Sequence, residues 1–220
     1  MIITIDGPAG AGKSSAAKLL ARRLGYEFLD TGGMYRAVTL AGLRAGCDLA
    51  DPNAMEALLA HMVLEMPAGK VLINGEDITG LIRTPEVTAA SGPVASNPAV
   101  RKKLGEWQRA LAAGRNMVCE GRDQGTLVFP DAACKFFLQA DPEERARRRH
   151  RQLLAAGETI SLEEVLRAQE ARDRRDADRH IAPMVPAGDA IIVDSTHLTL
   201  EQLVERMEEE VRRRLASQTQ

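Results

Sequence analysis

The sequence predicts an α/β fold in which a five-stranded parallel sheet is covered by helices on both faces. The first observation is an alternation along the 220 residues between short, apolar, β-branched segments and longer segments with apolar residues at helical spacing. The second is that polar residues directly follow the strand segments that end at Asp6, Asp30 and Glu120. Ligands of parallel α/β sheets bind beyond the carboxyl ends of the strands, so we expect these polar residues at one edge of the sheet.

The expected elements follow from hydrophobic periodicity and from residues that start or stop helices. Glycines 25 and 114 are read as helix stops, and Asn97-Pro98 and Asp141-Pro142 as helix starts. The expected strands cover residues 1–6, 26–30, 117–120, 134–138 and 190–194. The first expected helix follows the glycine-rich segment and ends at Gly25, and a later one begins at 51–52. A helix at 87–95 is expected to break at Gly92-Pro93. The other expected helices cover 34–43, 98–113, 142–156, 161–178 and 200–215.

A small β segment interrupts this alternation. Residues 63–66 and 70–75 have the pattern of short strands, and Pro67-Ala68-Gly69 between them has that of a tight turn. We interpret this segment as an inserted antiparallel subdomain that ends at about Pro85.

Composition excludes several classes of protein. The net charge of −2 gives no general attraction to nucleic acid or anionic membranes, and 3% aromatic residues are too few for a base-stacking surface. The three cysteines lack the spacing of a disulfide framework or a zinc site. The chain starts directly in a strand, and no apolar run is long enough to cross a bilayer, so we expect a cytoplasmic protein.

The first strand leads into a glycine-rich segment that matches the pattern G-x-x-x-x-G-K-[ST] of a phosphate-binding loop. Glycines allow backbone N–H groups to converge on phosphate, and the following helix adds positive partial charge at its N-terminus. Lys13 can reach the β- and γ-phosphates, and the Ser14 hydroxyl can hold Mg²⁺. The sequence therefore predicts an ATP site made by Gly7, Pro8, Ala9, Gly10, Ala11, Gly12, Lys13, Ser14 and Ser15.

This loop alone does not separate kinases from GTPases and motor ATPases. The guanine-reading pattern N-K-x-D is absent from the sequence, which disfavours a GTPase. Arginines are abundant in the late helices, and their planar guanidinium groups suit phosphoryl transfer because they bind phosphate oxygens in pairs. The alternative is a solvated helix with ion pairs, since Glu143–Arg147 and Glu144–Arg148 stand four residues apart. Four residues share one helix face on which cations surround a carboxylate, namely Arg172, Arg175, Asp176 and Arg179.

Several segments, in this order over nearly the whole chain, resemble the bacterial cytidylate kinases. They are residues 6–14 (DGPAGAGKS), 29–36 (LDTGGMYR), 82–87 (IRTPEV), 120–131 (EGRDQGTLVFPD) and 172–179 (RDRRDADR), followed by 182–184 (APM) and 189–190 (DA). The sequence departs from the family pattern at Gln124, where an apolar residue is usual, and at Gly33, where alanine is common.

The resemblance implies a P-loop kinase core, like that of adenylate kinase, which phosphorylates CMP and dCMP with ATP and Mg²⁺. It also implies a core at about 1–60, 86–147 and 187–220, a β insert at about 61–85 that belongs to the nucleoside monophosphate region, and a helical lid at about 148–186. The lid would close over ATP and exclude water.

The resemblance assigns roles to individual residues. Lys13, Arg122 and Arg172 would be catalytic, and Ser14 would contact the metal. Thr31, Arg101, Asp123 and Arg179 would surround the cytosine, Ser91 and Asp176 with Arg172 would lie near the sugar, and Arg36, Arg122 and Arg172 would hold the acceptor phosphate. Arg148, Arg149 and Arg175 would be lid contacts to the phosphates.

Two alternatives stay open at this point. Within the kinases, the acceptor could be UMP, AMP or a molecule that is not a nucleotide. From another class, the chain could be an ATP-dependent regulatory or RNA-binding module, which its slight acidity and few aromatic residues disfavour. We expect a monomer that binds small-molecule substrates and neither nucleic acid nor membranes.

Overall fold

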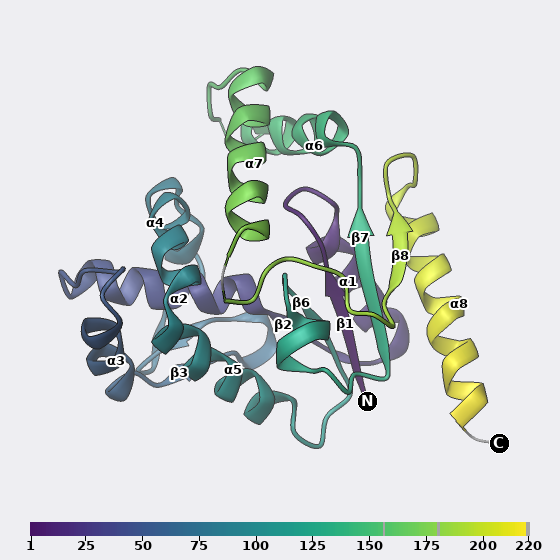
Figure 1. Cartoon of the computed structure of the whole chain (residues 1–220), viewed down its shortest axis with the longest axis horizontal. Helices are drawn as coiled ribbons and strands as arrows, with labels where there is room; N and C mark the ends of the chain where they lie inside the picture. Colours follow the sequence, from purple (N-terminus) through teal and green to yellow (C-terminus); the bar gives the residue numbers. More distant parts are fainter. Residues whose placement is uncertain (156, 180, 219–220) are drawn as a thin grey trace. The chain divides into compact units, whose positions relative to one another are not determined.

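A five-stranded sheet forms the centre of one part of the protein. In the computed structural model, which describes residues 1–155, 157–179 and 181–218, the strands have the order β2-β6-β1-β7-β8. Strand β1 pairs in parallel with β6 and β7, and β7 pairs in parallel with β8, its neighbour in Figure 1. The predicted fold class is therefore confirmed. The bounds are β1 (Ile2–Asp6), β2 (Glu27–Asp30), β6 (Met117–Glu120), β7 (Cys134–Gln139) and β8 (Ile191–Asp194).

The chain divides into two compact units. We call residues Met1–Leu29 with Gly114–Gln220 the sheet unit, and Asp30–Ala113 the helical unit. In the sheet unit, side chains of β1 and β7 such as Ile5 and Phe136 pack with Leu20 and Met207 from two helices, and all four are almost fully buried. The helices of this unit are α1 (Lys13–Leu24), α6 (Pro142–Ala155), α7 (Leu162–Ala177) and α8 (Leu200–Gln218).

The helical unit contains four helices and a very small sheet, in which β3, β4 and β5 pair antiparallel as predicted for the insert. Helix α2 packs on α4, and α3 packs on α5. The helices are α2 (Thr31–Arg44), α3 (Pro52–Ala60), α4 (Pro85–Ser96) and α5 (Pro98–Ala112). The remaining elements are β3 (Leu64–Glu65), β4 (Leu72–Ile73), β5 (Glu76–Asp77) and the 3₁₀ turns η1 (Pro67–Gly69) and η2 (Leu81–Arg83).

Two predicted helix limits are wrong. Helix α2 begins at Thr31 rather than at residue 34, because the Asp30 carboxylate accepts a hydrogen bond from Gly33 N (2.7 Å) and caps the helix. Helix α4 continues through Gly92-Pro93. Its buried residues Val87 and Val94 lie on either side of the proline, and packing of this apolar face outweighs the lost backbone hydrogen bond.

All three cysteines are free thiols. Cys119 on β6 and Cys134 on β7 are fully buried on either side of β1, as core residues, and burial raises the pKa of both, that of Cys134 to about 11. Cys47, in the segment between α2 and α3, is half-buried. None of the helices among the described residues is long and apolar enough to span a bilayer.

Candidate functional site

The phosphate-binding loop connects β1 to α1 and passes directly over the end of β7. Gly7 has a φ of 136°, and a Cβ at this position would lie 2.1 Å from the carbonyl oxygen of Leu138. Only glycine permits this approach, because the obstacle is backbone that cannot rotate away. The predicted strand, loop and helix are present in that order.

Lys13, the first residue of α1, is buried, and its ammonium group donates to Pro8 O (2.7 Å). Burial is the main cause that lowers its pKa to about 7, and the positive charges of Arg122 and Arg172 lower it further. These two arginines are the other predicted catalytic residues, so the sheet unit brings all three cations within electrostatic range of one another.

Ser14 lies one residue further along α1, and its hydroxyl donates to the Glu120 carboxylate (2.6 Å). Glu120 is the last residue of β6 and is 7% exposed. Glu120 was not among the predicted site residues, although its position at the polar end of a buried strand was the available signal. Hydroxyl and carboxylate oxygens are ligands that Mg²⁺ accepts, so this pair fits the predicted metal contact of Ser14.

A buried carboxylate links three predicted acceptor residues. Arg122 Nε donates to Asp176 Oδ2 (3.0 Å), and Arg179 also forms an ion pair with Asp176. Burial raises the pKa of Asp176, but the positive charges of Arg122, Arg179 and Arg172 outweigh it and lower the pKa overall. The predicted mixed face of the late helix is thus partly present. Arg175 departs from it, since it is exposed and its Nε donates to Ala171 O on its own helix.

Asp123 lies at the start of a π-helical turn, η3 (Gln124–Val128), and is 4% exposed. The turn is held by Asp6, whose two carboxylate oxygens accept from Gln124 N (2.9 Å) and Gly125 N (2.7 Å). Burial raises the pKa of Asp6 to about 6, although these two hydrogen bonds act in the opposite direction. The structure therefore connects the end of β1 directly to the loop that carries Arg122 and Asp123.

The helical unit holds the other predicted acceptor residues. Thr31 is the first residue of α2 and is buried, and Arg36 on the same helix forms an ion pair with Asp30 (3.4 Å). Ser91 lies on α4, where its hydroxyl donates to Thr88 O (2.8 Å). Arg101 of α5 donates to Ala95 O (2.9 Å), and its guanidinium lies 5.7 Å from the centre of the Tyr35 ring of α2.

The predicted lid arginines on α6 differ in their surroundings. Arg148 is held by hydrogen bonds to Ser195 O (2.7 Å) and Thr196 O (3.0 Å) and by an ion pair with Glu144. Arg149 is exposed and contacts Gln152 on its own helix (3.5 Å). The alternative of a helix with ion pairs is present here as well, since Arg147 pairs with Glu143 (2.8 Å).

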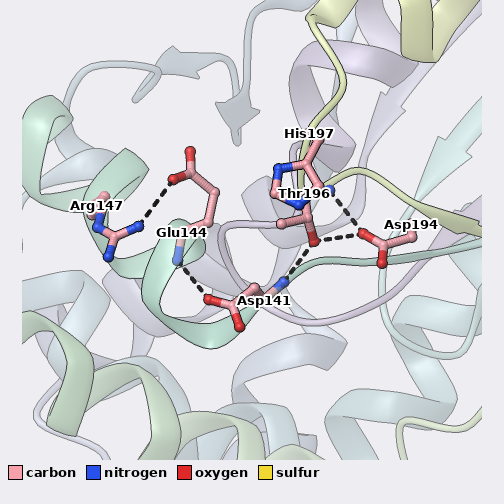
Figure 2. A pocket seen from close by; sticks show the side chains of 6 residues that line it. All are labelled: Asp141, Glu144, Arg147, Asp194, Thr196 and His197. Atoms are coloured by element: carbon pink, nitrogen blue, oxygen red, sulfur yellow. Dashed lines mark hydrogen bonds and ion pairs between the residues drawn. The ribbon is translucent and has the colours of Figure 1, made fainter.

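A pocket with a volume of about 350 Å³ lies between the start of α6 and the segment after β8. Figure 2 shows the Thr196 hydroxyl between Asp141 N (2.9 Å) and the Asp194 carboxylate (2.5 Å). The neighbouring Ser195 hydroxyl donates to Ala11 O of the phosphate-binding loop (2.9 Å), so the pocket adjoins that loop. It is lined by Asp141, Glu144, Arg147, Asp194, Thr196 and His197.

Two charged residues without a predicted role also contact the phosphate-binding loop. Arg145 of α6 donates to Ala9 O (2.9 Å), and Asp173 of α7 accepts from Ala9 N (3.3 Å). Helical spacing could not single them out, because each is surrounded by other arginines and acidic residues.

Comparison with known proteins adds to this geometry. The sequence profile of the family described as cytidylate kinase matches residues 3–213. The chain belongs to the cytidylate kinase family. It is 48% identical to a cytidylate kinase of Carboxydothermus hydrogenoformans over 97% of this chain and 98% of that protein. It is 45% identical to a cytidylate kinase of Pseudomonas entomophila over 96% and 95% of the two chains.

Solved structures support the fold of this cytidylate kinase family member. A gluconokinase from Sinorhizobium meliloti matches with a TM-score of 0.50 at 17% identity, over 99% of this chain and 97% of that one. A shikimate kinase from Bacteroides thetaiotaomicron matches with a TM-score of 0.50 at 15% identity, over 96% and 98%. At these identities the likeness concerns the fold alone.

Proposed function

We propose that the protein is a kinase that transfers the γ-phosphoryl group of ATP to CMP and dCMP and forms CDP and dCDP. Membership of the cytidylate kinase family supports the acceptor. The observation that carries the reaction type is the electrostatic proximity of Arg122 and Arg172 to Lys13 of the phosphate-binding loop, where burial first and then these two positive charges lower the pKa of Lys13. Phosphoryl transfer needs positioning and positive charge around the moving group, and this arrangement supplies both.

For the donor, we propose that residues 7–15 bind the ATP phosphates through backbone N–H groups and the Lys13 ammonium. Ser14 and Glu120 would hold Mg²⁺, which neutralises charge on the β- and γ-phosphate oxygens when it is bound. The pocket beside Thr196 adjoins the loop at Ala11 and has room for the donor base. The lid role of residues 148–186, with Arg148, Arg149 and Arg175 as phosphate contacts, belongs to this proposal.

For the acceptor, we propose that arginines bind the phosphate and that paired polar groups read the base. A carboxylate and an arginine complement cytosine, which presents an amino donor beside acceptors. Arg36, Arg122 and Arg172 would bind the phosphate, Ser91, Arg172 and Asp176 the sugar, and Thr31, Arg101, Asp123 and Arg179 the base. The attacking phosphate oxygen is already ionised, so the reaction requires no strong general base and no covalent intermediate.

The proposal also includes a monomer that acts in the cytoplasm, consistent with three free thiols. The domain assignment is part of it too, with a core, an acceptor-side insert at about 61–85 and the lid. The molar mass measured by light scattering would test the monomer directly.

Lys13→Ala tests the reaction. We expect turnover to fall by at least about 100-fold while the circular dichroism spectrum stays unchanged, because an interaction that stabilises the transferring phosphoryl group is lost. The measurement is ADP release in a coupled assay with CMP, dCMP, UMP, AMP and no acceptor in parallel. Lys18→Ala, at an exposed position on the same helix, is the matched control.

The acceptor panel decides between the candidate reactions. Turnover with CMP and dCMP well above UMP and AMP is the expected result. Near-normal rates in Lys13→Ala would contradict the mechanism, and a wild-type protein with no acceptor-dependent turnover that binds RNA in a salt-sensitive manner would favour the regulatory alternative.

A further inference from the structure

Both peptide groups of Ala9, in the phosphate-binding loop, are held by charged side chains from two other helices. The carbonyl accepts from the Arg145 guanidinium (2.9 Å), and the N–H donates to the Asp173 carboxylate (3.3 Å). Arg145 and Asp173 also form an ion pair with each other. The three groups close a ring of hydrogen bonds around a single residue of the loop.

The burial of Arg145 shows that this ring is more than a surface contact. Arg145 is 6% exposed, and its Nε donates to Ala140 O (3.0 Å) as well. A buried guanidinium needs a counter-ion, and Asp173 supplies it. By contrast, Arg147 on the same helix is exposed and forms its ion pair with Glu143 of α6 itself.

The backbone of α6 also lies directly against the loop. A Cβ on Gly10 would come within 3.0 Å of Arg145 Cβ, so residues 9 and 10 are packed against Arg145 with no space between them. Helices α6 and α7 pack on each other, which brings Asp173 to the same point. Asp173 stands beside Arg172 and three residues before Asp176, so it joins the loop to the helix that carries these two predicted acceptor residues.

We propose that Arg145 and Asp173 are a positioning pair for the ATP site. The pair fixes the Ala9 peptide groups and thereby holds the phosphate-binding loop in the conformation that binds the ATP phosphates. The pair acts through the loop and contacts no reacting atom. This inference rests on the proposed function only in taking ATP as the ligand of the loop. It adds two residues of α6 and α7 to the determinants of ATP affinity.

The test is the affinity for ATP, measured by calorimetric titration of the full chain in the absence of any acceptor. Arg145→Ala and Asp173→Ala are each expected to raise the Kd about tenfold, since displacement of binding groups by a fraction of an ångström has effects of this size. The double variant is expected to bind no more weakly than the weaker single variant, because each partner acts through the other. Glu170→Gln, an exposed carboxylate one turn earlier on α7, is the matched control and should bind like wild type.

Asp173→Asn separates the hydrogen bond of Asp173 to Ala9 N from its ion pair with Arg145. It also provides a conservative variant in case Asp173→Ala does not fold. It keeps an acceptor for Ala9 N but removes the charge that pairs with Arg145, so we expect a Kd between those of wild type and Asp173→Ala. Urea unfolding of each variant confirms that the folded fraction is complete at the titration temperature.

Three outcomes would overturn the proposal, namely unchanged or tighter ATP binding in both single variants, additive losses in the double variant, or an equal loss in Glu170→Gln. No acceptor is present, so these outcomes are independent of whether the enzyme phosphorylates CMP. A wild-type protein that phosphorylates CMP while the pair fails this test would leave the proposed function intact.

Discussion

At the scale of single residues, Asp6 connects the phosphate-binding loop to the loop that carries Arg122 and Asp123. It ends β1 immediately before Gly7, and its carboxylate holds the backbone of Gln124 and Gly125. Burial opposes ionisation of this carboxylate, while both hydrogen bonds favour it. The buried Asp6 carboxylate that holds this turn therefore lowers the free energy of unfolding when it is charged, and this effect depends on pH.

We expect the raised pKa of Asp6 to weaken the fold as pH rises. The pKa is about 6 in the folded protein against 3.8 for an aspartate in water, so the folded state retains the proton to a higher pH than the unfolded state does. The contribution of protonated Asp6 to the free energy of unfolding is complete below pH 3.8 and is lost as the pH rises through about 6. Relative to Asp6→Asn, wild type should lose on the order of 2 kcal/mol between about pH 4.5 and pH 7.

Urea unfolding of both proteins at the two pH values measures this change. Asp131→Asn, at an exposed position in the same unit, is the control and should follow the wild-type curve. A wild-type stability that rises relative to Asp6→Asn over this range would show that the hydrogen bonds of the charged form dominate over burial.

At the scale of elements, the sequence predicted the strands and most helix starts because capping residues act locally. Asn97-Pro98 illustrates this, since the Asn97 side chain accepts from Ala99 N (3.0 Å) and Val100 N (3.4 Å) at the start of α5. The same reasoning failed at Gly92-Pro93, where tertiary packing overrides a local helix breaker. Local signals are reliable where the interaction they predict is itself local.

The cap of α5 gives a test confined to the helical unit. Asn97 is 2% exposed and its amide also donates to Leu49 O (3.4 Å), so Asn97→Ala removes a cap and a tertiary hydrogen bond together. We expect a loss of about 1–3 kcal/mol in the free energy of unfolding. Chemical denaturation measures it, with the exposed Asn53→Ala on α3 as control. Equal stability of the two variants would contradict the capping role.

At the scale of the whole molecule, the sequence predicted which residues gather at the phosphate-binding loop better than which residues support them. Lys13, Arg122 and Asp176 were predicted as site residues, whereas Arg145, Asp173 and Glu120 were not, and their contacts at the loop are with residues distant in sequence. Hydrophobic periodicity predicts helices and strands but not which distant side chain will contact the loop. Such a contact becomes visible only when the fold brings α6, α7 and β6 to the loop.

The two sheets should differ in hydrogen exchange. Strand β1 lies between β6 and β7, of four and six residues, in a buried sheet, while the strands β3, β4 and β5 have two residues each. Local opening is rarer where more buried contacts must break. We expect the amides of β1, β6 and β7 to exchange most slowly and those of residues 64–77 among the fastest outside the termini. Exchange detected by mass spectrometry measures this, and equal protection of β4 and β1 would contradict it.

The distribution of the three thiols has a practical consequence. Cys119 and Cys134 are closed off within the sheet and hold their protons at neutral pH, whereas Cys47 is partly open to solvent in the helical unit. A maleimide dye added to the native chain should therefore attach at one position without any engineered cysteine. The unmodified sequence thus already offers a single labelling site, and a fluorophore there would report on the helical unit.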